Sequence, residues 1–300
     1  MSRYILLVLI ISSIVLSSCR QRKAVPGRHK TTFTTYTGSS GTAEAESGKR
    51  EINYGLLTPT EITSMFSRLG VPHDNSIMNP TGNADLYTSN AKAAINLGIY
   101  GVDVGYIKMF GFGQGMIDYI LTVKEMSNKL GIPDKFLIEP LKRVESDMSN
   151  PDTVMALLNK SYSDIESHLR TDGRESTAGL MLMGGWIEAM YITTQLLYDP
   201  DKPDSIVVEK IAQQKYSLNS LVGFMRNYYD DQMVVFYTKK LIFLKRYFDT
   251  FDIYFKKGDV EIDTSRKVLR ATGSDLTVSP ETLKEIRDYV KKLRTEITSP

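Results

Sequence analysis

Charged side chains inside otherwise apolar helical segments are the residues of this sequence best placed to do chemistry. Glu188 lies in an apolar stretch, and Arg143 and Glu145 lie close together in another segment with helical spacing. Two carboxyl groups that face one cleft can act as general acid and general base, which would indicate hydrolysis of an envelope glycan or peptide. A charge enclosed in a helical core needs an opposite charge instead, and a salt bridge between Arg143 and Glu188 is the pair we expect. The same buried polar cluster could also form a pocket for an anionic or sugar-like ligand.

The spacings typical of metal sites and common nucleophiles are missing from the sequence. The three histidines, His29, His73 and His168, belong to no His-x-x-x-His or His-x-x-Glu pattern, and a single cysteine rules out Cys-x-x-Cys. There is no Gly-x-Ser-x-Gly either. The glycine-rich stretch at 111–115 has no preceding strand and no following Lys-Ser or Lys-Thr, so we interpret it as a turn between helices. We therefore expect no metal and no cofactor, and we assign no catalytic residue.

Cys19, the only cysteine, follows an apolar run and precedes a group of cations. The run at 5–16 has the length of a signal-peptide core, about 12 residues, whereas crossing a bilayer takes about 20. Residues 16–19, Leu-Ser-Ser-Cys, resemble the lipobox of bacterial lipoprotein precursors. That resemblance implies cleavage before Cys19 and attachment of fatty acids such as palmitate to it. An ordinary secretory signal with an incidental cysteine is the alternative.

The residues after Cys19 are polar over a long stretch. Residues 20–56 are rich in Thr, Ser and Gly and cannot bury enough apolar surface to offset the entropy of ordering them. A flexible chain of this length spans roughly 30–36 Å. We therefore predict a lipoprotein signal peptide at 1–18, a disordered tether at 19–56 and a helical domain at 57–300.

The charge balance bears on partners and on location. The chain has 37 Lys and Arg against 35 Asp and Glu, a net charge of +2, and this argues against nucleic acid as a partner. Near Cys19 the charges are all positive: Arg20, Arg22, Lys23, Arg28 and Lys30. They either pair with anionic lipid head groups or begin a solvated linker. Surface-exported lipoproteins of Bacteroidetes-type bacteria carry acidic residues at this place, so the basic run favours the outer membrane, facing the periplasm.

From residue 57 onward, apolar residues recur every three or four positions, which predicts an all-α multi-helix bundle. Capping residues followed by proline mark two helix starts, at Asn150 and at Ser279. The expected helices lie near 58–70, 88–109, 115–130, 135–148, 150–170, 174–198, 205–228, 231–255 and 279–297. Residues 258–278 alternate weakly instead, and they form either a small β-hairpin or a loop.

Two apolar segments could be mistaken for membrane spans. Residues 178–198 contain Glu188, and residues 233–255 contain four cations and two aspartates, which are costly in lipid. We interpret both as helices of a water-surrounded bundle. The aromatic residues between 228 and 255 alternate with cations, a pattern also found in nucleic-acid binders, but at helical spacing it indicates core residues with solvated lysines.

Three glycines, Gly98, Gly101 and Gly105, fall on one face of the helix expected near 88–109, with Asp103 among them. Each costs about 1 kcal/mol relative to alanine in a helix, so something must offset the loss. We expect the close approach of a neighbouring helix, and a ligand lying against bare backbone is the alternative.

Three further stretches, GIYGVDVGY at 98–106, LKRVESDMSNPD at 141–152 and GGWIEAMY at 184–191, are together similar to an uncharacterised family of helical lipoproteins from Bacteroidetes-type bacteria. The resemblance implies a lipid anchor, an envelope location and an all-helical fold, and it transfers no site residue. The function we expect is a membrane-anchored lipoprotein whose helical domain binds an envelope protein or a small ligand, with membrane lipid contacted through Cys19. The alternative is an envelope hydrolase that uses carboxylates such as Glu145 and Glu188.

Overall fold

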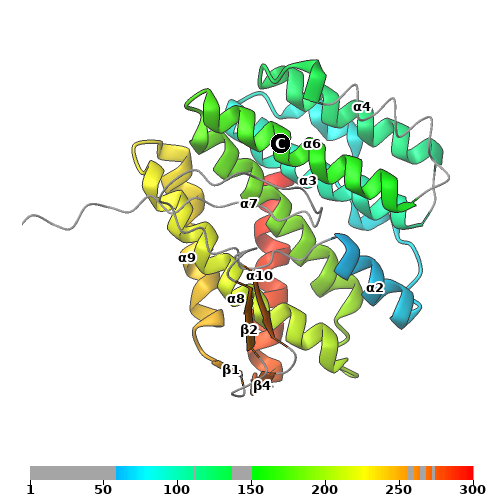
Figure 1. Cartoon of the computed structure of the whole chain (residues 1–300), viewed down its shortest axis with the longest axis vertical. Coiled ribbons are helices and arrows are strands. Elements are labelled where there is room, and N and C mark those ends of the chain that lie inside the picture. The colour runs from blue at the N-terminus through cyan, green and yellow to red at the C-terminus, as the bar shows by residue number, and fades with distance from the viewer. Residues whose placement is uncertain are drawn as a thin grey trace, which may run out of the picture. The chain divides into compact units, whose positions relative to one another are not determined.

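The structure is a computed structural model of the chain, and it describes residues 59–110, 113–136, 151–255, 260–263, 268–271 and 274–299. All of them belong to one compact unit, Thr31–Pro300. The α-helices are α2 (Pro59–Leu69), α3 (Asn90–Met109), α4 (Gly113–Lys129), α6 (Pro151–Thr171), α7 (Glu175–Ile192), α8 (Ser205–Met225), α9 (Gln232–Phe248) and α10 (Pro280–Thr298) (Figure 1). The shorter turns of helix are η1 (Asn75–Ile77), η2 (Thr81–Leu86), η3 (Asp134–Phe136), η5 (Arg226–Tyr228) and the π-helix η4 (Thr193–Leu197). The predicted all-α bundle is confirmed for the described residues.

The helix ends follow the capping signals in the sequence. The Ser279 hydroxyl accepts a hydrogen bond from the Thr282 backbone N–H, and Pro280 occupies the first helical position of α10, as predicted. Gly70 ends α2 with a positive φ of 63°, a conformation that glycine adopts without steric cost. Residues 135–148, where a further helix was expected, lie outside the described residues except for Lys135 and Phe136 in η3.

The helix expected over 231–255 is shorter than predicted. It ends at Phe248, and Ile253–Phe255 forms strand β1. Two short polar residues, Asp249 and Thr250, follow Phe248, and the Thr250 hydroxyl donates to the Tyr247 carbonyl at 2.7 Å, which satisfies a backbone group at the end of α9.

Three short strands, β2 (Val260–Asp263), β3 (Val268–Ala271) and β4 (Ser274–Leu276), lie within 258–278, where the sequence left a hairpin or a loop open, and β1 precedes them. Strand β1 pairs antiparallel with β4, and β2 pairs antiparallel with β3. The second pair therefore lies inside the first along the chain, as successive parts of one interrupted hairpin would.

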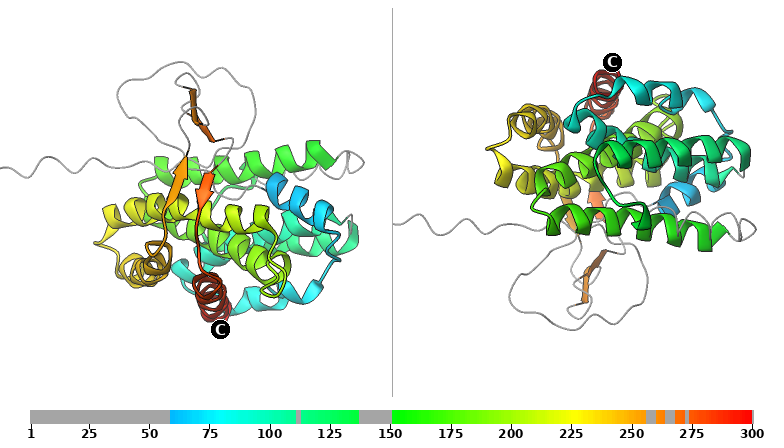
Figure 2. Two further views of the ribbon diagram at one scale, coloured as in Figure 1. Left: turned by 90° about the horizontal axis from the view of Figure 1, so that it is seen from below. Right: turned by 90° about the horizontal axis from the view of Figure 1, so that it is seen from above.

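The bundle is built around the contact between α3 and α7. Helix α3 also packs against α4 and α6, and α7 also packs against α6, α8, α9 and α10. In Figure 1, α10 passes behind α7, and both views of Figure 2 show α10 nearly end-on. Because α7 has neighbours on every side, it is buried almost all round from Ala178 to Ile192. No helix in the described part of the chain has both the length and the apolar character needed to cross a bilayer.

Glycine lets the two central helices touch backbone to backbone. A Cβ added to Gly98 on α3 would lie 2.0 Å from the carbonyl oxygen of Met181, and one added to Gly184 on α7 would lie 1.8 Å from that of Ile95. Real Cβ atoms never come this close to backbone atoms, so any larger residue would push the helices apart. For Gly98 the expected close approach of a neighbouring helix is confirmed.

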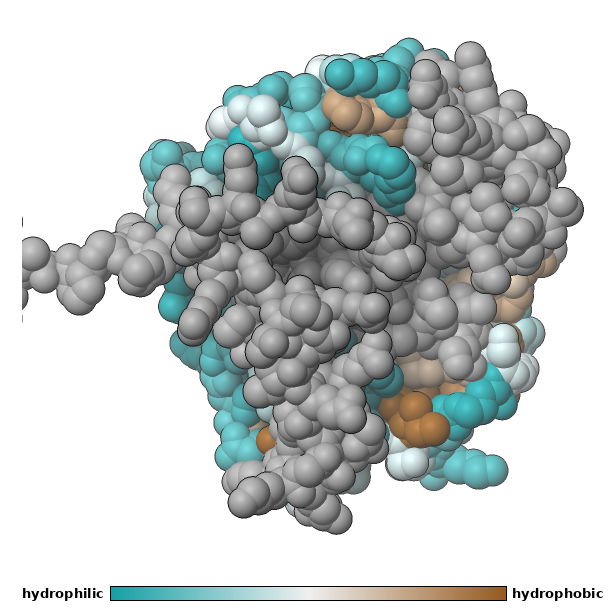
Figure 3. Space-filling view, viewed as in Figure 1, coloured by the Kyte–Doolittle hydropathy of each residue, from teal (hydrophilic) through white to brown (hydrophobic). Residues whose placement is uncertain are grey.

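Apolar side chains are mostly turned inward. Along α10, apolar residues recur every three or four positions and form an apolar edge that is buried at all five positions: Leu283, Ile286, Val290, Leu293 and Ile297. On the face shown in Figure 3, the coloured residues are mainly hydrophilic and the apolar ones form small, separate areas. The apolar stripes are therefore largely used in packing the helices together.

Candidate functional site

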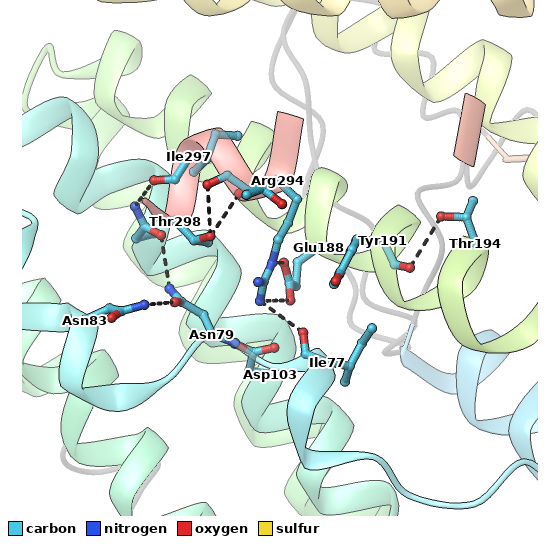
Figure 4. A network of polar contacts seen from close by, with 12 residues as sticks. Ile77, Asn79, Asn83, Asp103, Glu188, Tyr191, Thr194, Arg294, Ile297 and Thr298 are labelled. Atoms are coloured by element: carbon cyan, nitrogen blue, oxygen red, sulfur yellow. Dashed lines mark hydrogen bonds and ion pairs between the residues drawn. The ribbon is translucent and has the colours of Figure 1, made fainter. Parts of the chain in front are cut away.

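The charge inside α7 is neutralised by α10. Both oxygens of the Glu188 carboxylate accept hydrogen bonds from Arg294, Oε2 from Nε and Oε1 from Nη2, each at 3.0 Å (Figure 4). Nη2 also donates to the carbonyl oxygen of Ile77, again at 3.0 Å. Glu188 is fully buried and the Arg294 side chain is 10% exposed. The expected partner of Glu188 was Arg143; the structure gives it Arg294 instead, while Arg143 and Glu145 lie outside the described residues.

Arg294 reaches the core because it borders the apolar edge of α10. It follows Leu293 and lies one turn after Val290, so its stem enters the bundle with them. The guanidinium carbon lies 4.7 Å from the ring centroid of Tyr191, over the face of the ring. Burial alone would lower the pKa of Arg294, but the Glu188 carboxylate outweighs burial and the net shift of that pKa is upward. The guanidinium therefore stays charged.

A second carboxyl group, Asp103 of α3, lies beside this ion pair. It is fully buried, and its Oδ2 accepts a hydrogen bond of 3.1 Å from the Asn79 backbone N–H. Its Oδ1 has no donor among the described residues. Burial, and after it the negative charge of Glu188, raise the pKa of Asp103 well above its ordinary value.

The two carboxyl groups influence each other's pKa. The negative charge of Glu188 adds to the effect of burial on Asp103, and burial also leaves the pKa of Glu188 raised overall, although the charge of Arg294 opposes that shift. Arg294 hydrogen-bonds Glu188 and makes no such bond to Asp103, so the site disfavours the charged form of Asp103 more.

Amide side chains extend this network to the end of α10. The Asn79 side-chain nitrogen donates to the hydroxyl of Tyr87 at 3.1 Å and to Oδ1 of Asn96 at 3.2 Å. The Tyr87 hydroxyl in turn donates to the Thr298 carbonyl at 2.9 Å, and the Asn96 amide donates to the Ile297 carbonyl at 3.4 Å. These carbonyls belong to the last turn of α10, which has no partners within the helix. The network therefore fixes α10 against α3 at its C-terminal end and against α7 at Arg294.

The arrangement is closed to substrates in this structure. Neither Asp103 nor Glu188 exposes surface, and both Glu188 oxygens already accept from Arg294. General acid–base chemistry requires a carboxyl group within hydrogen-bond reach of a substrate, and this geometry does not offer one. What the arrangement does is enclose one ion pair, and beside it a carboxyl group with a raised pKa, where α3, α7 and α10 meet. Within the described ranges, no three His, Cys, Asp or Glu side chains are grouped as metal ligands would be.

Sequence reasoning found Glu188 but did not identify its partners. Asp103 was noticed only for its place among the glycines of α3, and Arg294 was not singled out. The signal for Arg294 was available: it lies four residues after Val290 and four before Thr298, inside the arc that α10 buries. The three hydrogen bonds of the Arg294 guanidinium, two to Glu188 and one to the Ile77 carbonyl, join segments far apart in the chain and were not visible in the sequence.

Comparison with protein-family models, with curated proteins and with solved structures found no significant match to this chain.

Proposed function

We propose that this chain is a cell-envelope lipoprotein in which an acylated Cys19 holds a helical binding domain at the membrane. The observation that carries the proposal is the sequence at 16–19, where Leu-Ser-Ser-Cys follows a short apolar run. Two or three acyl chains at Cys19 would anchor the protein firmly, because each buried methylene contributes about 0.8 kcal/mol. The polar stretch at 20–56 would then act as a tether of roughly 30–36 Å.

The sealed carboxyl pair supports a binding role over a hydrolytic one. Hydrolysis through carboxylates was motivated by Glu145 and Glu188, and Glu188 is closed over Arg294. Glu145, the other carboxylate of that hypothesis, lies outside the described residues. Under this proposal, an envelope protein or a small ligand binds on an outer surface of the helical domain.

The likeness of 98–106, 141–152 and 184–191 to helical lipoproteins of Bacteroidetes-type bacteria supports the same proposal. Under it, the basic residues after Cys19 favour an outer-membrane protein that faces the periplasm. The described helices agree with the fold that this resemblance implies.

Metabolic labelling tests the anchor. Cells that produce the unaltered chain and are fed radiolabelled palmitate should give a labelled protein that fractionates with membranes. Cys19→Ser should abolish the label, while Ser18→Ala should retain it, because small residues are usual before a lipobox cysteine. An unlabelled wild-type chain, or a labelled Cys19→Ser chain, would refute the lipoprotein proposal.

An assay with purified protein tests the alternative, hydrolysis through carboxylates. Purified wild-type chain and a Glu145→Gln, Glu188→Gln double variant should leave peptidoglycan and envelope peptides equally intact. Hydrolysis by the wild type that the double variant loses would instead favour the enzyme.

A further inference from the structure

The outer face of α9 carries large apolar side chains that the core does not use. Met233, Phe236, Lys239, Phe243 and Arg246 are exposed and recur every three or four residues along the helix; we call these five residues the α9 surface. The two phenylalanines are 45% and 41% exposed. The opposite face supplies the core residues of this helix: Val234, Tyr237, Thr238, Leu241, Leu244 and Phe248. The expectation that the aromatics of 228–255 are core residues therefore fails for Phe236 and Phe243.

The α9 surface is also positively charged. Helix α9 contains four cations and no acidic residue between Gln232 and Phe248. Lys240 pairs with Glu296 of α10 at 2.7 Å, and Lys245 pairs with Asp249. Lys239 and Arg246 have no acidic partner among the described residues, and the guanidinium of Arg246 lies over the Phe243 ring, 5.5 Å from its centroid. Within the described part of the chain, no carboxylate competes with an outside anion for these two cations.

Helix α10 holds the aromatic part of this surface in place. The ring of Phe243 stacks on Tyr289 with centroids 4.9 Å apart, and the Tyr289 hydroxyl donates to the Lys240 carbonyl at 3.2 Å. The ammonium of Lys240 lies 4.5 Å from the ring centroid of Phe236. Because these contacts orient both rings before any partner arrives, binding costs less side-chain entropy.

We propose that the α9 surface docks the helical domain on a bilayer that contains anionic lipids, an inference that rests on the proposed lipid anchor at Cys19. Aromatic residues favour the boundary between head groups and acyl chains, and Lys and Arg side chains reach from there to the head-group phosphates. The α9 surface has aromatic and cationic side chains that alternate along one exposed side of the helix.

The order of residues favours a bilayer over other partners. Lys239 lies between Phe236 and Phe243, in the middle of the face, where protein–protein interfaces are depleted in lysine. A nucleic acid would require a broad basic stripe, and only two cations of this face lack an acidic partner among the described residues. A membrane fits the alternation of apolar and cationic side chains, because its interface places apolar acyl chains next to anionic head groups.

The predicted tether makes weak docking effective. A chain of roughly 30–36 Å would keep the domain at high effective concentration beside the membrane that holds Cys19. Two modest attachments on one molecule then reinforce each other, so the α9 surface does not need high affinity by itself.

A single fluorescent label can report the docking. Cys19→Ser gives a full-length chain with no other thiol, so Met233→Cys adds a unique site on the α9 surface for an environment-sensitive dye. The matched control is Leu121→Cys, which places the same dye on an exposed apolar position of α4, 58% exposed in the structure. Both chains carry the same N-terminal residues, so a difference between the labels reports which face meets the lipid.

The probes are vesicles of phosphatidylcholine alone and vesicles with about one third phosphatidylglycerol. The dye at position 233 should shift to the blue and be quenched by lipid-phase nitroxides with the anionic vesicles, and less so at high salt, whereas the dye at 121 should not respond. Lys239→Gln and Arg246→Gln should each weaken partitioning about fivefold, and about 25-fold together, because each cation near an anionic surface contributes about that factor.

Equal responses of the two labels, or no response at position 233 with either vesicle, would overturn the docking inference. So would a response at 233 to a short oligonucleotide, or to rising protein concentration, in the absence of lipid. These results do not depend on acylation, which palmitate labelling of the wild-type chain reads separately. Failure of the anchor and failure of the α9 surface are therefore distinguishable.

Discussion

Replacement of Arg294 by methionine tests whether the buried network is what the geometry implies. Methionine keeps most of the apolar stem but removes the two hydrogen bonds of 3.0 Å to Glu188 and the one to the Ile77 carbonyl. Hydrogen bonds to charged groups contribute about 1.5–3 kcal/mol each. Removing one partner of a buried ion pair costs about 3–5 kcal/mol, because the other charge remains without compensation. We expect Arg294→Met to lower the free energy of unfolding by that amount at pH 7.

The deficit should depend on pH, and its sign follows from the loss of the cation. Without Arg294, the folded state raises the pKa of Glu188 above the unfolded value of about 4.3, so the folded chain binds the extra proton. A raised folded-state pKa gives stability that is present at low pH and is lost as pH rises. The deficit of Arg294→Met should therefore shrink between pH 7 and pH 5, by at most about 1.4 kcal/mol per pH unit.

Urea unfolding followed by circular dichroism at pH 5 and pH 7 measures both effects. The matched control is the double variant Glu188→Gln, Arg294→Met, in which no charge is left unpaired at this place. It should recover most of the stability that Arg294→Met loses, and its difference from wild type should vary little with pH. A deficit below about 1 kcal/mol for Arg294→Met, or one that grows as pH falls, would refute our account of the pair.

Three further predictions concern single positions. Asp103→Asn should become more stable relative to wild type as pH rises, by up to about 1.4 kcal/mol per pH unit, because wild type must keep a proton on Asp103 that the unfolded chain releases; urea titrations at pH 4.5 and pH 7.5 check this. Gly184→Ala should cost roughly 2–4 kcal/mol through its backbone clash, while Gly223→Ala, which meets nothing within 4 Å, should gain about 0.5–1 kcal/mol; thermal melting compares them. Asp204→Asn keeps the N-cap of α8 but loses the charge that Arg68 and backbone N–H groups stabilise. Because its hydrogen bond with Arg68 lowers the pKa of Asp204, the stability gap to wild type should be fully present at pH 6 and should shrink progressively as pH falls below about 4; urea titrations at pH 6 and pH 3 check this.

Most of the helices could be predicted because their positions depend on capping residues and apolar spacing within short stretches of sequence. The apolar edge of α10 and its Ser279 cap are properties of a few consecutive residues, and both are confirmed. The end of α9 was predicted seven residues too late, at 255 instead of 248. Apolar residues continue past Phe248 at helical spacing, which favours a longer helix. A strand of three residues is too short to show the alternation of apolar and polar residues that identifies strands in a sequence.

The candidate site could be predicted only in part, because its contacts join residues far apart in the chain. Glu188 was recognisable as a charge in an apolar helix, and the need for a partner followed from its desolvation. The choice of Arg294 depends on how α7 and α10 cross, and the raised pKa of Asp103 depends on α3 bringing a second carboxyl group to the same place. Neither crossing leaves a trace in sequence spacing.

The buried network and the α9 surface are linked through α10. Helix α10 supplies Arg294, which binds Glu188. It also supplies Tyr289, which stacks on Phe243, and Glu296, which pairs with Lys240. A change that loosens α10 should therefore weaken lipid docking even though it lies on no exposed face. Arg294→Met should reduce the blue shift of a dye at position 233 on anionic vesicles, and the double variant Glu188→Gln, Arg294→Met should restore the shift together with stability. If stability returns without the shift, α10 does not support the α9 surface in the way that these contacts imply.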